Sequence, residues 1–183
     1  MTNKVLQFKY LFKIFIFIPL IFYFGKRSYI AFDEGFYALQ ARWILDKGNW
    51  TIPLWWDEYN LDRTIGLQYL IAKSQDIFGR NLFSAYLPTT AAAILMLFIT
   101  YKLHEEFFNK QYAIISPLIL STTYLWFDYS HLATQDIIYS CLVSIGLYSL
   151  LKIKNKDNKF YILLFGMWIG LAFMMKTFLV FVP

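Results

Sequence analysis

The chain has 183 residues, of which 58% are hydrophobic, 21% aromatic and only 16% charged. A typical soluble domain is about half apolar and about a quarter charged, so this composition argues against a soluble globular protein and, more firmly, against intrinsic disorder. The composition is that of a membrane protein, so the formal net charge of +5 has to be interpreted from how the chain is placed in a bilayer.

Five apolar runs are long enough, or nearly so, to cross the hydrocarbon core of a bilayer, which takes about 20 residues of helix. They span residues 6–25, 82–101, 112–129, 136–151 and 160–175. The first run is followed by Lys26 and Arg27 without a small-residue cleavage pattern, so we expect an uncleaved anchor and not a signal peptide. The runs predict an all-α fold, a multi-pass transmembrane helical bundle with about five crossings.

Basic residues separate the two sides of this bundle. The amino terminus and the turn between the fourth and fifth runs are strongly basic, whereas the long loop 26–81 holds seven basic and seven acidic residues. Because Lys and Arg are retained in the cytoplasm, we expect a cytoplasmic amino terminus, an outer loop over residues 26–81, and a location in the plasma (inner) membrane. The net charge is then an orientation signal, and it does not argue for a nucleic-acid partner.

The outer loop is too long and too aromatic to be a simple connection. Asp33 is a good N-cap for a helix running to about Lys47, and Gly48 is placed to end it. A second helix is predicted over residues 64–78, ending near Gly79. The first of these helices is apolar on nearly every side, so both are expected to be juxtamembrane helices lying on the bilayer surface or on other helices, joined by a tryptophan-rich loop.

Acidic residues gather at the outer ends of the predicted helices. Asp33 and Glu34 are adjacent; they either complement a helix dipole and cap free N–H groups, or they form part of a site in which a carboxylate takes a proton from a hydroxyl. Asp136 begins the fourth crossing on the same predicted side, where it is either a helix cap or a member of that site. Both alternatives stay open for each position.

Four cations share the outer side with these acids. Lys73 and Arg80 are best explained as interfacial anchors to lipid headgroups, whereas Arg63 and Lys176 are better placed to hold a phosphate. No group of His, Cys and Glu has metal-ligand spacing, and the sequence has neither a Gly-rich phosphate loop nor a serine or cysteine nucleophile signature. No cofactor is assigned, and a divalent cation at the acids is left open.

Six short segments, in order along the chain, resemble motifs of the GT-C membrane glycosyltransferases, in particular the protein O-mannosyltransferase and aminoarabinose (lipid A) transferase group. Residues 33–37 resemble its Asp-Glu-x-x-Tyr motif, and residues 48–53 its Gly-Asp-Trp-x-x-Pro stretch. Asp62 and Arg63 fall where the group carries Asp-Lys-Pro-Pro, and residues 82–88 are similar to its Phe-x-x-Arg-Leu-Pro segment. The last two segments, 131–136 and 170–176, resemble its Arg-x-x-Ala-x-x-Asp and Gly-Leu-Ala-x-x-x-Lys motifs.

The resemblance implies transfer of a sugar from a polyprenyl-phosphate donor to the hydroxyl of a lipid, glycan or protein acceptor, with inversion at the anomeric carbon. It implies that Asp33 is the base, that Glu34 orients substrate and that Asp136 orders the site or a cation. Arg63 and Lys176 would be the phosphate partners. The remaining substrate-binding candidates are Tyr37 and His131.

The apolar sequence continues to Pro183 without a polar tail, so we expect residues 1–183 to be the N-terminal part of a longer GT-C type domain. Two alternatives to an active transferase stay open. One is a multi-pass transport or assembly subunit without chemistry, and the other is a folded but inactive truncated transferase.

Overall fold

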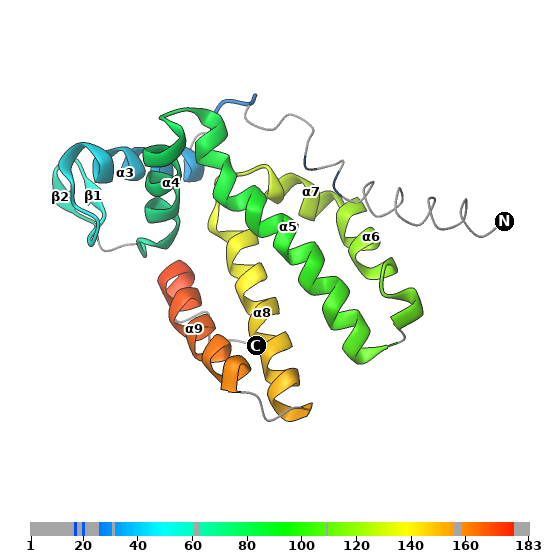
Figure 1. Cartoon of the computed structure of the whole chain (residues 1–183). Coiled ribbons are helices and arrows are strands. Elements are labelled where there is room, and N and C mark those ends of the chain that lie inside the picture. The colour runs from blue at the N-terminus through cyan, green and yellow to red at the C-terminus, as the bar shows by residue number, and fades with distance from the viewer. Residues whose placement is uncertain are drawn as a thin grey trace.

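The computed structural model describes a chain built almost wholly of helices (Figure 1). The described residues are 17, 20, 26–30, 32–60, 63–108, 110–155 and 159–177. The predicted first crossing, residues 6–25, lies outside the described residues except for positions 17 and 20, and so does Asp62.

Three helices among the described residues are long and apolar enough to cross a membrane. They are α5 (Leu82–Phe107), α8 (Gln135–Asn155) and α9 (Lys159–Lys176). Helix α8 packs against both of the others and lies between them (Figure 1). These helices confirm the all-α membrane architecture and match three of the five predicted runs, with α5 and α8 longer than expected.

The predicted third crossing, residues 112–129, is not one helix. The chain forms a short 3-10 turn, η1 (Lys110–Tyr112), and then two helices, α6 (Ile115–Thr122) and α7 (Tyr124–Ser130), separated by Thr123 in an extended conformation. The hydroxyls of Thr122 and Thr123 donate to carbonyls of the preceding helical turn, at distances of 2.7 to 3.1 Å. Hydroxyls that bond to the backbone in this way compete with helix propagation, which hydrophobicity alone does not reveal.

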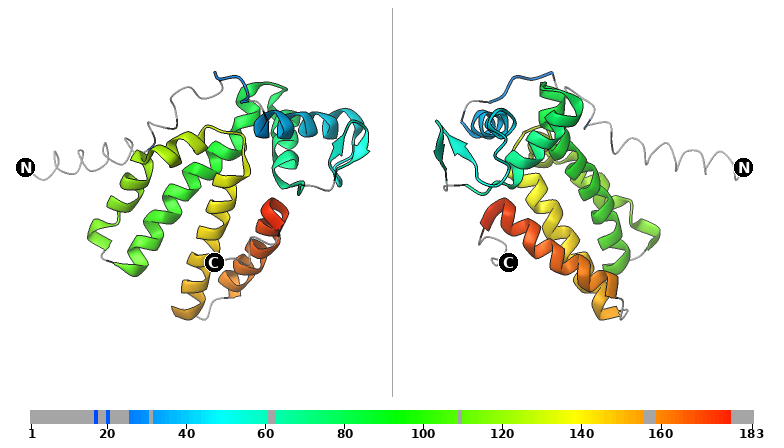
Figure 2. Two further views of the ribbon diagram at one scale, coloured as in Figure 1. Left: turned by 180° about the vertical axis from the view of Figure 1, so that it is seen from behind. Right: turned by 60° about the vertical axis from the view of Figure 1, so that its left-hand side comes forward.

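The outer loop folds into a compact layer at one end of the bundle (Figures 1 and 2). Helix α3 (Asp33–Lys47) packs against α4 (Gly66–Phe78) through a core that includes Ala41, Ile44, Leu67 and Ile71. Both helices stop at glycines with positive φ, Gly48 at 70° and Gly79 at 85°, where a left-handed backbone carries no Cβ penalty. The glycines thus fix the predicted ends.

The start of α3 differs from the prediction. The N-cap is Phe32, which makes no side-chain cap hydrogen bond, and Asp33 is the first helical residue. The Asp33 carboxylate is ion-paired with Arg63 at 2.9 Å. The side chain expected to cap the helix is therefore directed to a cation from another segment.

The tryptophan-rich loop between the two outer helices contains a small antiparallel hairpin, β1 (Leu54–Trp55) and β2 (Glu58–Tyr59), with Trp55 opposite Glu58. Its two turn residues, Trp56 and Asp57, both have positive φ, as in the tight turns that suit the strand twist. Lys47 at the end of α3 reaches the turn and pairs with Asp57 at 2.8 Å. The hairpin thereby closes onto α3.

Candidate functional site

The Glu34 side chain forms a buried junction that joins the start of α3 to the loop between α7 and α8. Its carboxylate is 1% exposed and accepts hydrogen bonds from the backbone N–H groups of Ile30 and Ala133, each at 2.6 Å. The Arg27 guanidinium donates to both carboxylate oxygens at 3.0 and 3.1 Å and also to the carbonyl of His131 at 3.1 Å. We call this arrangement the Glu34 junction; it uses the carboxylate to connect protein segments.

Asp33, one residue earlier, lies in a different environment. Its side chain is 58% exposed, and it pairs with Arg63, whose Nη1 also donates to the Tyr37 hydroxyl at 2.7 Å. The guanidinium lies over the rings of Phe36 and Tyr37, with its central carbon 5.1 and 5.2 Å from their centroids. The planar fork of an arginine fits such stacking, so the aromatic residues of α3 hold Arg63 in place beside the carboxylate.

Burial raises the pKa of the Tyr37 phenol, although the hydrogen bond from Arg63 acts in the opposite direction. The negative charges of Asp33 and Asp136 both add to the rise, so both carboxylates act on the same hydroxyl. Burial also lowers the pKa of Arg63, but its contacts with Tyr37 and Asp33 outweigh that effect and leave the pKa above its ordinary value. At neutral pH the phenol keeps its proton and the guanidinium its charge.

The second carboxylate–cation pair is Asp136 with Lys176, whose Nζ donates to Oδ1 at 2.6 Å. The carboxyl end of α9 reaches this point because it docks on the start of α4, where the Thr64 hydroxyl donates to the Met175 carbonyl at 2.6 Å. A Cβ on Gly66 would lie 2.6 Å from the carbonyl oxygen of Met174, so only glycine permits this approach. The contact brings Lys176 into the same region as Arg63.

Both cations line one cavity of about 240 Å³, which we call the site cavity. Its lining residues come from the outer layer, the start of α8 and the end of α9. Figure 2 shows these helix ends below the outer layer. Its lining consists of Tyr37, Arg63, Thr64, Gln135, Met175, Lys176 and Thr177. The structure therefore brings together five residues singled out in the sequence. Asp33 and Asp136 take part through their ion pairs, and the cavity wall holds Tyr37, Arg63 and Lys176.

Gln135 is a residue of the site cavity that the sequence did not single out. Its side chain is 8% exposed, and its Nε2 is buried without a hydrogen-bond partner among the described residues. Buried amide groups are almost always paired, so an unpaired one in a cavity wall suits a ligand that supplies the acceptor. The only sequence signal was its place directly before Asp136.

His131 and Glu34 lie away from the cavity lining. The His131 Nδ1 approaches the carbonyl of Phe127 at 2.7 Å, and its ring packs on that of Phe127. The role of His131 in substrate binding stays a prediction. The structure shows that the His131 carbonyl belongs to the Glu34 junction. The predicted contact of Glu34 with substrate likewise stays a prediction, and its described partners are protein groups.

The described residues do not fit a metal centre. No three His, Cys, Asp or Glu side chains among them are grouped so as to hold a metal ion. Asp33 and Asp136 are instead each paired with a protein cation. The arrangement of charges suits an anionic ligand group between Arg63 and Lys176, with a carboxylate beside each of the two cations.

The protein is an all-α membrane bundle, and acidic residues and cations suited to a phosphate lie together at one end of its helices. This architecture is expected of a lipid-dependent transferase. A family model described as dolichyl-phosphate-mannose-protein mannosyltransferase matches residues 62–183, and the chain belongs to this family. The resemblance to the GT-C glycosyltransferases is thereby confirmed, and the chain is a membrane protein.

Several curated relatives are named undecaprenyl phosphate-alpha-4-amino-4-deoxy-L-arabinose arabinosyl transferase. The protein of Wigglesworthia glossinidia brevipalpis is 30% identical over 97% of this chain and 33% of its own length. That of Enterobacter sp. (strain 638) is 28% identical over 80% of this chain and 28% of its own length. The chain thus spans about a third of the length of the curated relatives it matches.

Among solved structures, the chain resembles ArnT from Cupriavidus metallidurans bound to undecaprenyl phosphate, with a TM-score of 0.87 and 17% sequence identity. The match covers 96% of this chain and 34% of that one. The apo state of the same protein gives a TM-score of 0.85. At this identity the likeness establishes the fold.

Proposed function

We propose that the chain is the N-terminal portion of a membrane glycosyltransferase that moves a sugar from a polyprenyl-phosphate donor to an acceptor hydroxyl at the outer face of the inner membrane. The observation that carries the proposal is the site cavity, with one carboxylate–cation pair from Asp33 and Arg63 and a second from Asp136 and Lys176. The names of the relatives favour undecaprenyl phosphate as the carrier.

The reaction needs a base because an alcohol is a weak nucleophile. In the proposed step the Asp33 carboxylate takes the proton of the acceptor hydroxyl, whose oxygen forms a bond to the anomeric carbon. The bond from that carbon to the phosphate oxygen breaks, and the lipid phosphate leaves with the electron pair. Attack opposite to the leaving group inverts the anomeric carbon, and a positioned base typically contributes about 10² to 10⁴ in rate.

Arg63 and Lys176 are the proposed partners of the departing phosphate. Fixed positive charge stabilises the developing anion without reorganisation at the moment of reaction. Arg63 is held by the Phe36 and Tyr37 rings, so its orientation is set before the donor arrives. Lys176 is a point charge on a flexible stem, and its pairing with Asp136 keeps it at the cavity.

The remaining cavity residues are assigned to the donor and to the scaffold. The Gln135 amide donates to an oxygen of the phosphate or the sugar, and the protonated Tyr37 phenol has a hydrogen to give because it receives one from Arg63. Glu34 acts as a positioning residue that fixes the start of α3 against the loop preceding α8. No step is assigned to a metal ion.

The orientation in the membrane follows from charge. The site cavity lies at the end of the bundle where the outer layer packs, and the loop that forms this layer balances its basic and acidic residues. The basic segments lie at the amino terminus and between α8 and α9. By the positive-inside rule the amino terminus is cytoplasmic and the site faces outward.

The proposal is tested by transfer of label from a radioactive polyprenyl-phosphate sugar in membranes that contain the complete gene product, of which this chain is the proposed N-terminal portion. Asp33→Asn should lower the rate by about 10² to 10⁴ without changing the amount of inserted protein. Asp57→Asn, which removes an exposed hairpin acid paired with Lys47, is the matched control and should transfer normally. Transfer by Asp33→Asn at the unaltered rate would contradict Asp33 as the base. Donor binding without transfer by the complete gene product would favour the non-catalytic alternative and contradict the proposal.

A further inference from the structure

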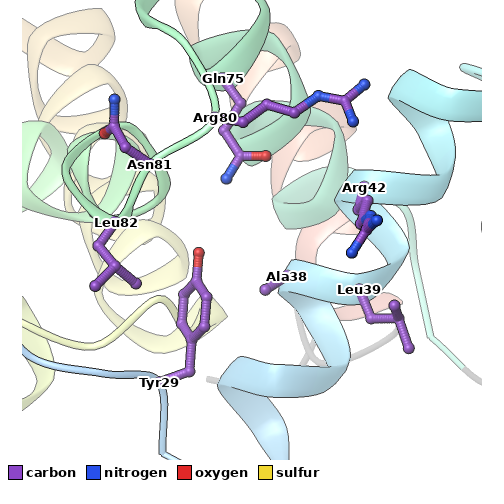
Figure 3. A pocket seen from close by; sticks show the side chains of 8 residues that line it. All are labelled: Tyr29, Ala38, Leu39, Arg42, Gln75, Arg80, Asn81 and Leu82. Carbon is purple, nitrogen blue, oxygen red and sulfur yellow. The ribbon is translucent and has the colours of Figure 1, made fainter.

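A second cavity, of about 540 Å³, lies between the outer layer and the start of α5, and Figure 3 shows its lining. The lining comes from the segment before α3, from α3 itself, from α4 and from the turn into α5. It consists of Tyr29, Ala38, Leu39, Arg42, Gln75, Arg80, Asn81 and Leu82. The two cavities share none of their lining residues. We call this second cavity the Arg42–Arg80 cavity.

The charges around this cavity are unbalanced. Arg42 and Arg80 both pair with one carboxylate, Asp46, at 3.4 and 2.6 Å, and none of the described lining residues is acidic. The hydrogen bond from Arg80 holds the pKa of Asp46 below its usual range, so Asp46 is charged at neutral pH. One carboxylate against two guanidiniums leaves a net positive charge beside an open volume. A surface with two guanidinium groups suits a phosphate, because arginine binds phosphate through paired N–H groups.

Neutral donors complete the lining. The Tyr29 hydroxyl points into the cavity toward the Gln75 amide (Figure 3). The Asn81 amide instead caps α5, where its Oδ1 accepts from the Ser84 N–H at 2.8 Å and its Nδ2 donates to the Phe78 carbonyl at 3.3 Å. Burial raises the pKa of the Tyr29 phenol, and the negative charge of Glu34 adds to the rise, which outweighs the opposite effect of Gln75. The phenol therefore keeps its proton at neutral pH. The Tyr29 hydroxyl and the Gln75 amide line one volume with two guanidiniums and provide polar partners for a small ligand group.

The cavity lies at the depth of lipid headgroups. Leu82, one of its lining residues, is the first residue of α5, which is long and apolar enough to cross a membrane. The polar headgroup layers add about 10 to 15 Å to the hydrocarbon thickness of a bilayer, and the end of a spanning helix lies within one of them. Lipid phosphates are concentrated in this layer.

We propose that the Arg42–Arg80 cavity binds a phosphate group, and that its position at the start of α5 makes a membrane lipid the source of that phosphate. The site is separate from the proposed transfer chemistry and uses none of its residues. It gives Arg80, expected from the sequence to be a general interfacial anchor, a defined partner together with Arg42. The volume is within the range of about 300 to 1,000 Å³ typical of small-molecule sites, and it accommodates a headgroup.

The test is calorimetric titration of the full chain, purified in detergent, with dihexanoyl phosphatidic acid, dihexanoyl phosphatidylcholine and inorganic phosphate. Every protein in the titration also carries the substitutions Arg63→Met and Lys176→Met, so that binding to the site cavity does not contribute to the measured heat. We expect phosphatidic acid to bind, and the double variant Arg42→Gln, Arg80→Gln to weaken its affinity at least about tenfold. Lys73→Gln removes a cation of the same layer outside the cavity and should leave binding unchanged.

A second variant separates loss of binding from loss of folding. Asp46→Asn removes the carboxylate that both arginines share, so phosphatidic acid should bind about threefold or more tightly, a gain that misfolding cannot produce. Unchanged affinity in the double arginine variant, or weaker binding after Asp46→Asn, would overturn the site. Binding of neither phospholipid would also overturn it, whereas equal binding of phosphatidylcholine, which carries a phosphate too, would keep the site. Inorganic phosphate bound as tightly as phosphatidic acid would keep the phosphate site and overturn the lipid source.

Discussion

The Glu34 junction and the site cavity begin at neighbouring residues of one helix and differ in almost every physical respect. Glu34 is 1% exposed and is surrounded by an arginine and two backbone N–H groups, whereas Asp33 is 58% exposed and has one arginine partner. A carboxylate whose lone pairs are taken up by protein donors holds segments together. One that keeps access to solvent beside a cation can still exchange a proton. The contrast separates a structural acid from the acid to which we assign the proposed chemistry.

The largest structural effect is expected at the Glu34 junction. Glu34→Gln replaces a carboxylate oxygen by an NH₂ group that cannot accept, and it leaves Arg27 without its counter-charge. Breaking a buried ion pair in this way typically costs about 3 to 5 kcal/mol, so the melting temperature in detergent should fall strongly. Glu58→Gln in the exposed hairpin is the control and should melt as the unaltered chain does. Equal melting of both variants would remove the distinction between the junction and the surface.

Gly66→Ala tests the contact that brings Lys176 to the site cavity. The added Cβ would clash with the Met174 carbonyl, and overpacking of this kind costs about 1 to 3 kcal/mol. We expect transfer to fall as α9 moves away from α4. Gly48→Ala is the matched control, because Gly48 has a positive φ but no neighbour within 4 Å of the new Cβ. It should lower stability through the backbone alone and leave the transfer rate per folded molecule unchanged.

Arg63→Lys should separate charge from geometry in the site cavity. Lysine keeps the positive charge but loses the planar fork that donates to Tyr37 and stacks on Phe36. Loss of one charge-assisted hydrogen bond is worth about 1.5 to 3 kcal/mol, so the KM for the donor should rise about tenfold or more. An unchanged KM would show that the guanidinium does not contact the donor.

The smallest effect is expected from an exposed ion pair away from both regions. Lys73 and Asp76 lie 3.0 Å apart on the surface of α4, with side chains about half exposed. Such pairs contribute about 0 to 1 kcal/mol, so Asp76→Asn should change neither the melting temperature nor transfer beyond experimental error. A clear loss of stability or of transfer would mean that exposed charge on α4 contributes as much as the charges of the Glu34 junction or the site cavity.

The sequence predicted the outer layer well because its helices end at glycines. Gly48 and Gly79 have left-handed backbone conformations, and that local requirement is readable without tertiary information. The break at Thr123 was missed because the third run is hydrophobic on average, and hydropathy does not register hydroxyls that compete for backbone carbonyls. The first predicted crossing lies outside the described residues except for positions 17 and 20.

The candidate site was predictable in its charges and not in its contacts. Asp33, Arg63, Asp136 and Lys176 are ionisable residues at helix ends, and membrane topology puts them on one side. The burial of Glu34 depends on a backbone group 99 residues away, Ala133, which spacing cannot reveal. Gln135 was missed for a similar reason, since an unpaired amide is recognisable only once its surroundings are known.

The central claim is that the two cations of the site cavity bind one donor phosphate. The most direct measurement is the affinity for polyprenyl phosphate of four proteins. They are the unaltered chain, Arg63→Met, Lys176→Met and the double variant. A shared phosphate predicts one lipid per chain and coupling between the two substitutions of about 0.5 to 3 kcal/mol. Independent, additive losses with two lipids bound per unaltered chain would contradict a single site.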